Sequence, residues 1–112
     1  MKKVRIEHAT DNQLNWLVAK IKGLLGDDGK LSEAYCDSLR HDQDGGFVDD
    51  WDQGGPLLPE GKVTVMWDWG EWYAYSVGHT NVHWAETYLK AGIRVFVSIH
   101  LGDEAEVPDE LS

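Results

Sequence analysis

The sequence is short of cysteine, of basic residues and of long apolar runs, and each shortage excludes a class of protein. Cys36 is the single cysteine among 112 residues, so an intramolecular disulfide and a four-cysteine zinc site are both excluded. No uncharged apolar segment approaches membrane-spanning length, and the opening residues MKKVRIEHATDNQ lack the apolar core of a signal peptide. We therefore expect a cytoplasmic protein that does not use a membrane as a partner.

The shortage of basic residues shapes the expected partners. There are 10 lysines and arginines against 20 aspartates and glutamates, which gives a formal net charge of −10. Such a chain repels the phosphate backbone, so we expect no direct binding to nucleic acid. An acidic surface can instead cover a basic surface of another protein, although acidity that only maintains solubility is the more common case.

The residues that are present suit one globular domain. Hydrophobic residues make up 42% and charged residues 27% of the chain, and there are six tryptophans and four tyrosines. This balance is typical of a folded protein, and the large rings must enter a core, an interface or a pocket. We expect a single compact domain over residues 1–101, followed by an acidic, extended tail over residues 102–112.

The first helix has the clearest pattern. Val4 and Ile6 predict a short strand, and Thr10 with Gln13 three residues later predicts a capping box at a helix start. Apolar residues then recur at helical spacing, at Leu14, Leu17, Val18, Ile21, Leu24 and Leu25. Gly26 is the expected end of this helix.

A hairpin over residues 62–77 is expected in the middle of the chain. The β-rich run KVTVMW (62–67) meets the turn DWG (68–70), and EWYAYSV (71–77) alternates back. Both faces of the return strand are partly apolar. This indicates a sheet that helices cover on one side and a loop or a partner covers on the other.

The last element is expected to be a long helix. We expect it from about Val82 to Leu101, with Thr80 or Asn81 as the cap and Gly102 as the stop. Helical periodicity favours it, at Ala85, Tyr88, Leu89, Gly92, Ile93, Phe96, Val97 and Leu101. The β-branched residues of 93–101 leave a strand as the alternative there, and residues 31–40 fit a helix or a strand equally. The predicted fold class is α+β, with an N-terminal helix and a long C-terminal helix packed on a small antiparallel sheet.

Three stretches together carry a family resemblance. They are LNWLVAK (14–20), DDWDQGGPLL (49–58) and IRVFVSIHLGDEAEVPDEL (93–111). In this order they resemble the NinX-like family of small tailed-phage proteins, over most of the chain from Leu14 to Leu111 and most weakly at 27–48. The resemblance implies non-structural phage or prophage cargo that acts in the cytoplasm of an infected or lysogenic bacterium. It implies no catalytic residues.

The corner at residues 51–56 is the first candidate site. The glycines Gly54 and Gly55 allow a ligand to approach the backbone, whose amides can form an anion nest. Trp51 could stack on a base, while Gln53 could read a polar edge. The alternative is a tight structural turn with the tryptophan as a lid on the core, because glycine and proline build turns more often than sites.

Two further residues complete the predicted ligand-binding set. Trp69 lies in the predicted turn, where it fits core packing poorly, and Arg94 could anchor a phosphate or pair with an acidic loop residue. The aromatic run around Trp69 could form a stacking wall, or it could be sheet packing or a homo-oligomer interface.

Metal and catalytic sites are not expected. His79, His83 and Glu86 could share one helical face and hold zinc, but such short coincidences are frequent. The sequence shows no recognisable pair of a nucleophile and a general base, so we predict that the protein is not an enzyme and uses no cofactor. The predicted function is a non-catalytic phage accessory protein that binds a nucleotide-like small molecule in the host cell and so evades host defence. The alternative is an acidic inhibitor that covers a basic surface of a host protein.

Overall fold

A computed structural model gives the fold of the chain, with residues 1–26, 46–48, 50–79, 82–109 and 111 described. The ambiguous segment 31–40, which includes Cys36, lies outside the described residues. The elements are, in order, β1 (Lys2–Arg5), η1 (Ile6–His8), α1 (Asp11–Ile21), α3 (Trp51–Gly54), α4 (Leu57–Glu60), β2 (Val63–Asp68), β3 (Glu71–Ser76), β4 (His83–Ala85), α5 (Tyr88–Leu101) and β5 (Glu104–Val107).

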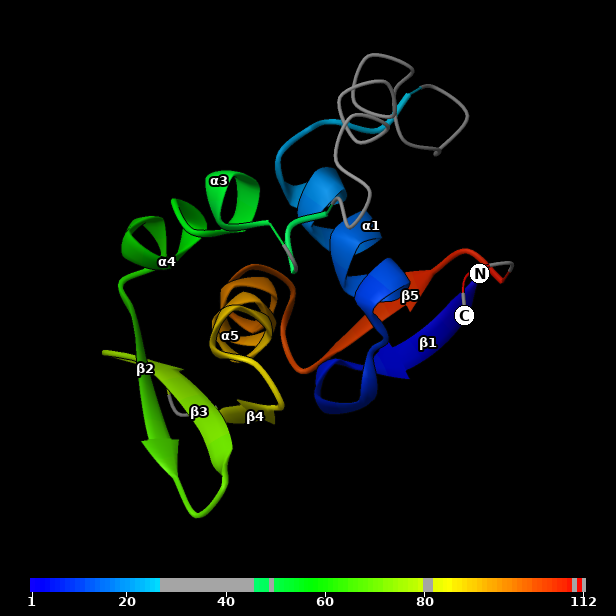
Figure 1. Cartoon of the computed structure of the whole chain (residues 1–112). Coiled ribbons are helices and arrows are strands. Elements are labelled where there is room, and N and C mark those ends of the chain that lie inside the picture. Colours follow the sequence, from blue (N-terminus) through cyan, green and yellow to red (C-terminus); the bar gives the residue numbers. More distant parts are fainter. Residues whose placement is uncertain (27–45, 49, 80–81, 110, 112) are drawn as a thin grey trace.

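The fold is α+β, as predicted, and α5 is its centre. Figure 1 shows α5 between the sheet β2-β3-β4 on one side and α1 with the β1-β5 pair on the other. Phe96 and Ile93 of α5 are fully buried together with Leu14 and Leu17 of α1. On the opposite side of α5, small residues such as Ala91 allow the sheet to lie close. Within the described residues every helix is too short or too polar to cross a bilayer.

Helix α1 confirms the predicted capping box and corrects the predicted end. The Thr10 hydroxyl accepts from the backbone N–H of Gln13 at 3.2 Å, and the Gln13 side chain accepts from the Thr10 N–H at 3.0 Å. The helix ends at Ile21 rather than at Gly26. Gly23 takes a φ of +73°, which ends the helix because a left-handed residue redirects the chain.

The predicted hairpin is confirmed. Strands β2 and β3 pair antiparallel with Met66 opposite Tyr73, and the turn residues Trp69 and Gly70 have φ values of 54° and 85°. Two consecutive positive φ values match the right-handed twist of a two-residue hairpin turn. The ordinary residue for the first of these positions is asparagine, aspartate or glycine, so a tryptophan there is unusual.

The C-terminal helix begins later than predicted. Residues 83–85 form β4, which pairs with β3, and α5 begins at Tyr88. The actual cap is Thr87, whose hydroxyl accepts from the N–H of Lys90 at 3.2 Å. The alternative of a strand over 93–101 is wrong, because this segment is helical and its β-branched residues fill the core.

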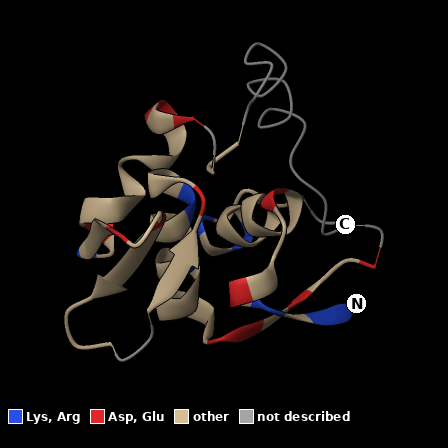
Figure 2. Ribbon diagram, turned by 60° about the horizontal axis from the view of Figure 1, so that its bottom comes forward, with Lys and Arg blue, Asp and Glu red and all other residues tan. Residues whose placement is uncertain are grey.

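The expected acidic tail contains a strand. Residues Glu104–Val107 pair antiparallel with β1, and Val107 is fully buried against the α1 side of the core. Figure 2 shows the blue of β1 beside the red of β5, which reflects the pairing of Lys3 with Glu106 in the register. The first and last strands therefore form one small sheet.

Candidate functional site

A row of four aromatic rings runs from α3 to the hairpin. The ring centroids of Trp51 and Tyr88 lie 5.4 Å apart, those of Tyr88 and Trp72 lie 5.1 Å apart, and those of Trp72 and Trp67 lie 5.0 Å apart. The first of these three contacts is tilted and the other two are edge-on, a geometry that aromatic pairs prefer. Because Tyr88 is the first residue of α5, the row crosses the N-terminal end of the central helix.

A cavity of about 190 Å³ lies at one end of this row. Its lining comes from two places in the chain, Val48 and Trp51 before and within α3, and Thr87, Tyr88 and Leu89 at the start of α5. Trp51 is 56% exposed, so one side of its indole packs on Tyr88 while much of the ring remains in contact with solvent. One wall of the cavity is therefore an aromatic ring that is still in contact with solvent.

The Trp51–Pro56 corner is helical rather than a simple turn. Asp50 caps α3 with its carboxylate, which accepts from the Asp52 N–H at 2.8 Å. The N–H groups of Gln53 and Gly54 donate to the Asp50 carbonyl oxygen at 3.1 and 2.7 Å, and the N–H of Gly55 donates to that of Trp51 at 3.0 Å. These amides are engaged within the corner, so they do not form an open anion nest.

The glycine at position 54 has a packing role beneath the cavity. A Cβ atom added to Gly54 would lie 1.9 Å from the carbonyl oxygen of Phe47 and 3.2 Å from a methyl group of Leu89. Only glycine therefore lets α3 approach the 46–48 segment and α5 so closely. The Gln53 amide donates to the Asp50 carboxylate at 3.4 Å. Of the predicted corner residues, Trp51 alone contributes to the cavity lining.

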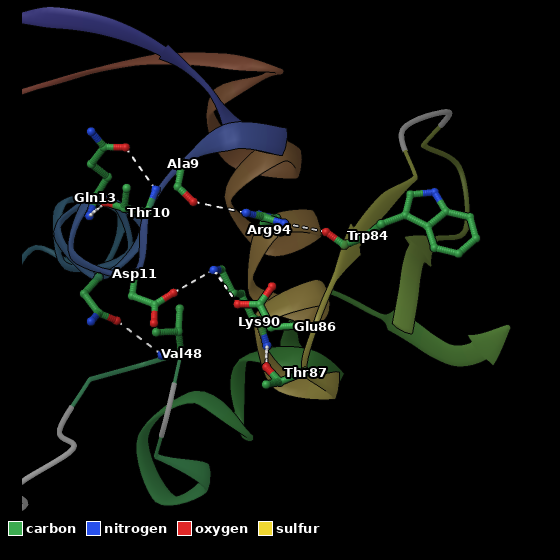
Figure 3. A network of polar contacts seen from close by, with 11 residues as sticks. Ala9, Thr10, Asp11, Gln13, Val48, Trp84, Glu86, Thr87, Lys90 and Arg94 are labelled. Carbon is green, nitrogen blue, oxygen red and sulfur yellow. Dashed lines mark hydrogen bonds and ion pairs between the residues drawn. The ribbon is translucent and has the colours of Figure 1, made fainter. Parts of the chain in front are cut away.

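Arg94 is buried and holds three segments together. Its guanidinium donates to the carbonyl oxygen of Trp84 on β4 and, at 3.1 Å, to that of Ala9 before α1 (Figure 3). Burial lowers the pKa of Arg94, and the carboxylates of Glu86 and Asp11 offset part of that effect. An arginine used in this way fixes the positions of neighbouring elements and is not in the cavity lining.

Lys90 forms a second polar network at the start of α5. Its ammonium group lies 2.9 Å from a carboxylate oxygen of Asp11 and 2.9 Å from one of Glu86 (Figure 3). Burial lowers the pKa of Lys90, but the hydrogen bonds to both carboxylates outweigh burial and leave that pKa above its usual value. The same hydrogen bond lowers the pKa of Glu86. Lys90 is therefore a cation already neutralised by its neighbours.

The suggested zinc trio is not assembled. His83 lies on β4 and is buried, while Glu86 is exposed and bonded to Lys90, and the helix that was to align them begins only at Tyr88. Among the described residues no group of three or more histidine, cysteine, aspartate or glutamate side chains is placed to hold a metal ion. Neither ring nitrogen of His83 has a hydrogen-bond partner within the described part of the chain.

Trp69 lies apart from the cavity lining, at the tip of the hairpin. It is 93% exposed and stands in the turn next to Asp68 and Glu71. Sequence reasoning missed the other four lining residues, Val48, Thr87, Tyr88 and Leu89. The helix was expected to start near residue 81, which placed Tyr88 and Leu89 on its apolar stripe. Thr87 is itself a typical N-cap residue, and that signal was available in the sequence.

Fold and cavity define a small α+β protein with an aromatic-walled cavity at the start of its central helix. A family model described as "Bacteriophage P22, NinX" matches residues 7–100. The chain belongs to this phage NinX family. None of the curated proteins matches it. This match confirms the predicted resemblance and supports the role of a phage accessory protein.

Proposed function

We propose that this phage protein binds a planar, nucleotide-like small molecule in the cavity beside Trp51 and releases it unchanged. The observation that carries the proposal is the cavity itself, which joins an exposed indole to the first turn of a long helix. Stacking of a base on an aromatic ring contributes about 1–3 kcal/mol. The action is sequestration rather than catalysis.

The size of the cavity selects the part of the ligand that it holds. A volume of about 190 Å³ is below the roughly 300–1,000 Å³ of pockets that enclose a drug-sized molecule. One planar ring system fits, and the sugar and phosphate remain outside. The ring stacks on Trp51, and Thr87 lines the same space.

The start of α5 supplies the place for a phosphate. The first N–H groups of any helix lack a backbone acceptor within the helix, and the helix dipole favours an anion there. In α5 the N–H of Lys90 already donates to the Thr87 hydroxyl, so a phosphate would use the N–H groups before it. Helix α5 has 14 residues, and its residues Tyr88 and Leu89 line the cavity. Asp50, Asp52 and Glu86 are also close in sequence to this lining, so a ligand with one charge per phosphate, such as a cyclic nucleotide, is favoured over a triphosphate.

In the infected bacterium, binding of this kind would withdraw a nucleotide signal from host defence. The family places the protein among phage accessory proteins, and we propose that it acts in the host cytoplasm.

A ligand panel tests the proposal. Nucleosides, cyclic mononucleotides, cyclic dinucleotides and triphosphates are titrated into the protein while tryptophan fluorescence and binding heat are recorded. The bound ligand is then recovered by denaturing the protein and is identified by mass. We expect a cyclic nucleotide to bind and to return with its mass unchanged.

Variants locate the site. Trp51→Ala removes the stacking wall, so we expect binding at least about tenfold weaker. Trp84→Thr removes an exposed indole outside the cavity lining and serves as the matched control, with unchanged affinity expected. The proposal fails if no ligand of the panel binds, if the ligand returns altered, or if a folded Trp51→Ala variant binds as well as the parent.

A further inference from the structure

The outer face of the sheet β2-β3-β4 is a second aromatic surface, separate from the cavity. Side chains alternate along a strand. Ala74 and Ala85 pack on α5, which places Met66, Tyr73 and Trp84 on the opposite face of the sheet. These three residues stand in one row across the strands, because Tyr73 is paired with Met66 on one side and with Trp84 on the other. Figure 3 shows the Trp84 ring pointing away from α5.

Contacts among these side chains make the face a preformed surface. The ring centroids of Tyr73 and Trp84 lie 5.0 Å apart, those of Tyr73 and Tyr75 lie 6.4 Å apart and nearly parallel, and the Tyr73 hydroxyl donates to the Met66 sulfur at 3.2 Å. Met66 and Trp84 nevertheless remain 45% and 42% exposed. The rings are ordered by one another and still face solvent.

The turn end of the same face is acidic. Asp68 and Glu71 are directly opposite each other in the register, and alternation places both on the side of Tyr73. Like charges directly opposite each other destabilise a strand pair. The sequence from Val63 to Leu89 contains no lysine or arginine, so the segment itself supplies no cation to relieve this repulsion.

Trp69, at the turn end of this face, has an unfavourable backbone conformation. It joins Asp68 to Gly70 with a φ of 54°, a conformation that bulky residues rarely adopt, and its side chain is 93% exposed. Folding alone favours asparagine or glycine at this position. The turn therefore holds an exposed indole ring at a position where its geometry favours a smaller residue.

We infer that this acidic-aromatic face docks an arginine-rich segment of a partner protein. The face comprises Met66, Asp68, Glu71, Tyr73 and Trp84, with Trp69 exposed in the turn at its acidic end. A guanidinium group stacks on indole and phenol rings and forms paired hydrogen bonds with carboxylates, so it matches both components of the face.

Charge decides between the occupants. A second copy of this chain would bring Asp68 and Glu71 against the same carboxylates, between two molecules that each carry a net charge of −10. Nucleic acid and anionic membranes are repelled for the same reason. A basic polypeptide gains both charge attraction and ring stacking.

A synthetic peptide in which arginine alternates with glycine is the probe. Its affinity for the full chain is measured by calorimetry at low and at moderate salt, beside a peptide with glutamine in place of each arginine. We expect the arginine peptide to bind, to weaken as salt rises, and to bind at least about tenfold more tightly than the glutamine peptide. Equal binding of the two peptides would overturn the inference.

Two pairs of variants separate a local site from general charge. Asp68→Asn with Glu71→Gln should lower the affinity for the arginine peptide about tenfold. Glu104→Gln with Glu106→Gln on β5 removes the same number of charges elsewhere and should change that affinity little. An equal loss in both pairs overturns the site, because the attraction would then be global.

The rings are tested by Tyr73→Thr with Trp84→Thr, since threonine keeps a high strand propensity. A folded double variant should lose about tenfold in peptide affinity, while Trp51→Ala in the cavity should not. Sedimentation provides the other decisive measurement. If the parent chain forms a dimer that this double variant abolishes, a second copy occupies the face and the inference is wrong.

Discussion

Arg94 of α5 and Ala9 of the N-terminal segment are joined by a hydrogen bond, with Nη2 of Arg94 3.1 Å from the carbonyl oxygen of Ala9, although 85 positions separate them in the chain. The same guanidinium also donates to the carbonyl oxygen of Trp84. One buried side chain thus holds β4 and the segment before α1 against the central helix.

Loss of this side chain should be costly. Arg94→Met keeps the length of the apolar stem but leaves two carbonyl oxygens without their donor, so we expect the free energy of unfolding to fall by about 2–4 kcal/mol. Urea denaturation measures this free energy. Arg5→Met, which breaks an exposed ion pair with Glu7 at 2.8 Å, is the control and should cost less than about 1 kcal/mol. Equal losses in the two variants would show that Arg94 has no such role.

Close packing at the corner gives a second prediction. Gly54→Ala places a methyl group where the carbonyl oxygen of Phe47 lies, so α3 must shift. We expect a loss of about 1–3 kcal/mol of stability and weaker binding in the cavity, because Trp51 moves with α3. The neighbouring Pro56→Ala is the control, with a change of less than about 1 kcal/mol. A Gly54→Ala protein as stable as the parent would contradict the packing described for α3.

Stability should fall in mild acid because of His83. Burial lowers the pKa of His83, Asp103 at 3.9 Å raises it, Arg94 lowers it and Glu7 raises it, and the net shift is downward. The unfolded chain then binds a proton at a higher pH than the folded chain does. Stability is complete above the unfolded value of about 6.5 and declines as pH falls from there toward the folded pKa.

The test compares unfolding free energies at pH 7.5 and about pH 5.5. We expect the parent to lose stability over this interval and His83→Leu to lose less of it, because leucine cannot be protonated. His79→Gln changes an exposed histidine and should keep the parent's pH dependence. If His83→Leu and the parent have the same pH dependence, burial of His83 does not control it.

Trp69 should show opposite effects on stability and on binding. Trp69→Asn creates the Asn-Gly pair that this turn geometry prefers, so thermal unfolding should shift upward by an amount equivalent to about 0.5–1 kcal/mol. The same variant should bind the arginine peptide more weakly, because an exposed ring is lost. A loss of stability, or unchanged peptide affinity, would contradict the assignment of Trp69 to a partner.

Much of the fold could be predicted because the local signals agree with the packing. The capping pair Thr10 and Gln13 and the alternation of residues 62–77 act over a few residues, so the sequence displays them directly. The boundaries at residues 22 and 87 were harder. Leu24 and Leu25 continue the apolar stripe beyond the end of α1, and the segment 83–85 fits a helical pattern although pairing with β3 makes it a strand.

The candidate cavity was predictable only in part. Trp51 was named from the corner motif, but its partner Tyr88 comes from 37 positions later in the sequence, and no local pattern shows that their rings meet. Arg94 was expected at a phosphate or an ion pair, but its partners are backbone carbonyl oxygens. Every residue has such an oxygen, so the residue types in the sequence do not identify these partners. Long-range contacts of this kind are set by tertiary packing rather than by propensity.

The pairing of β1 with β5 has a consequence for synthesis in the cell. Strand β1 can complete its hydrogen bonds only when residues 104–107 have also emerged from the ribosome. Until then Ile6, which is fully buried in the finished fold, lacks the cover of Val107. Closure of the α1 side of the core therefore waits for a strand about a hundred positions further along the chain, and a non-local step of this kind is expected to limit the folding rate.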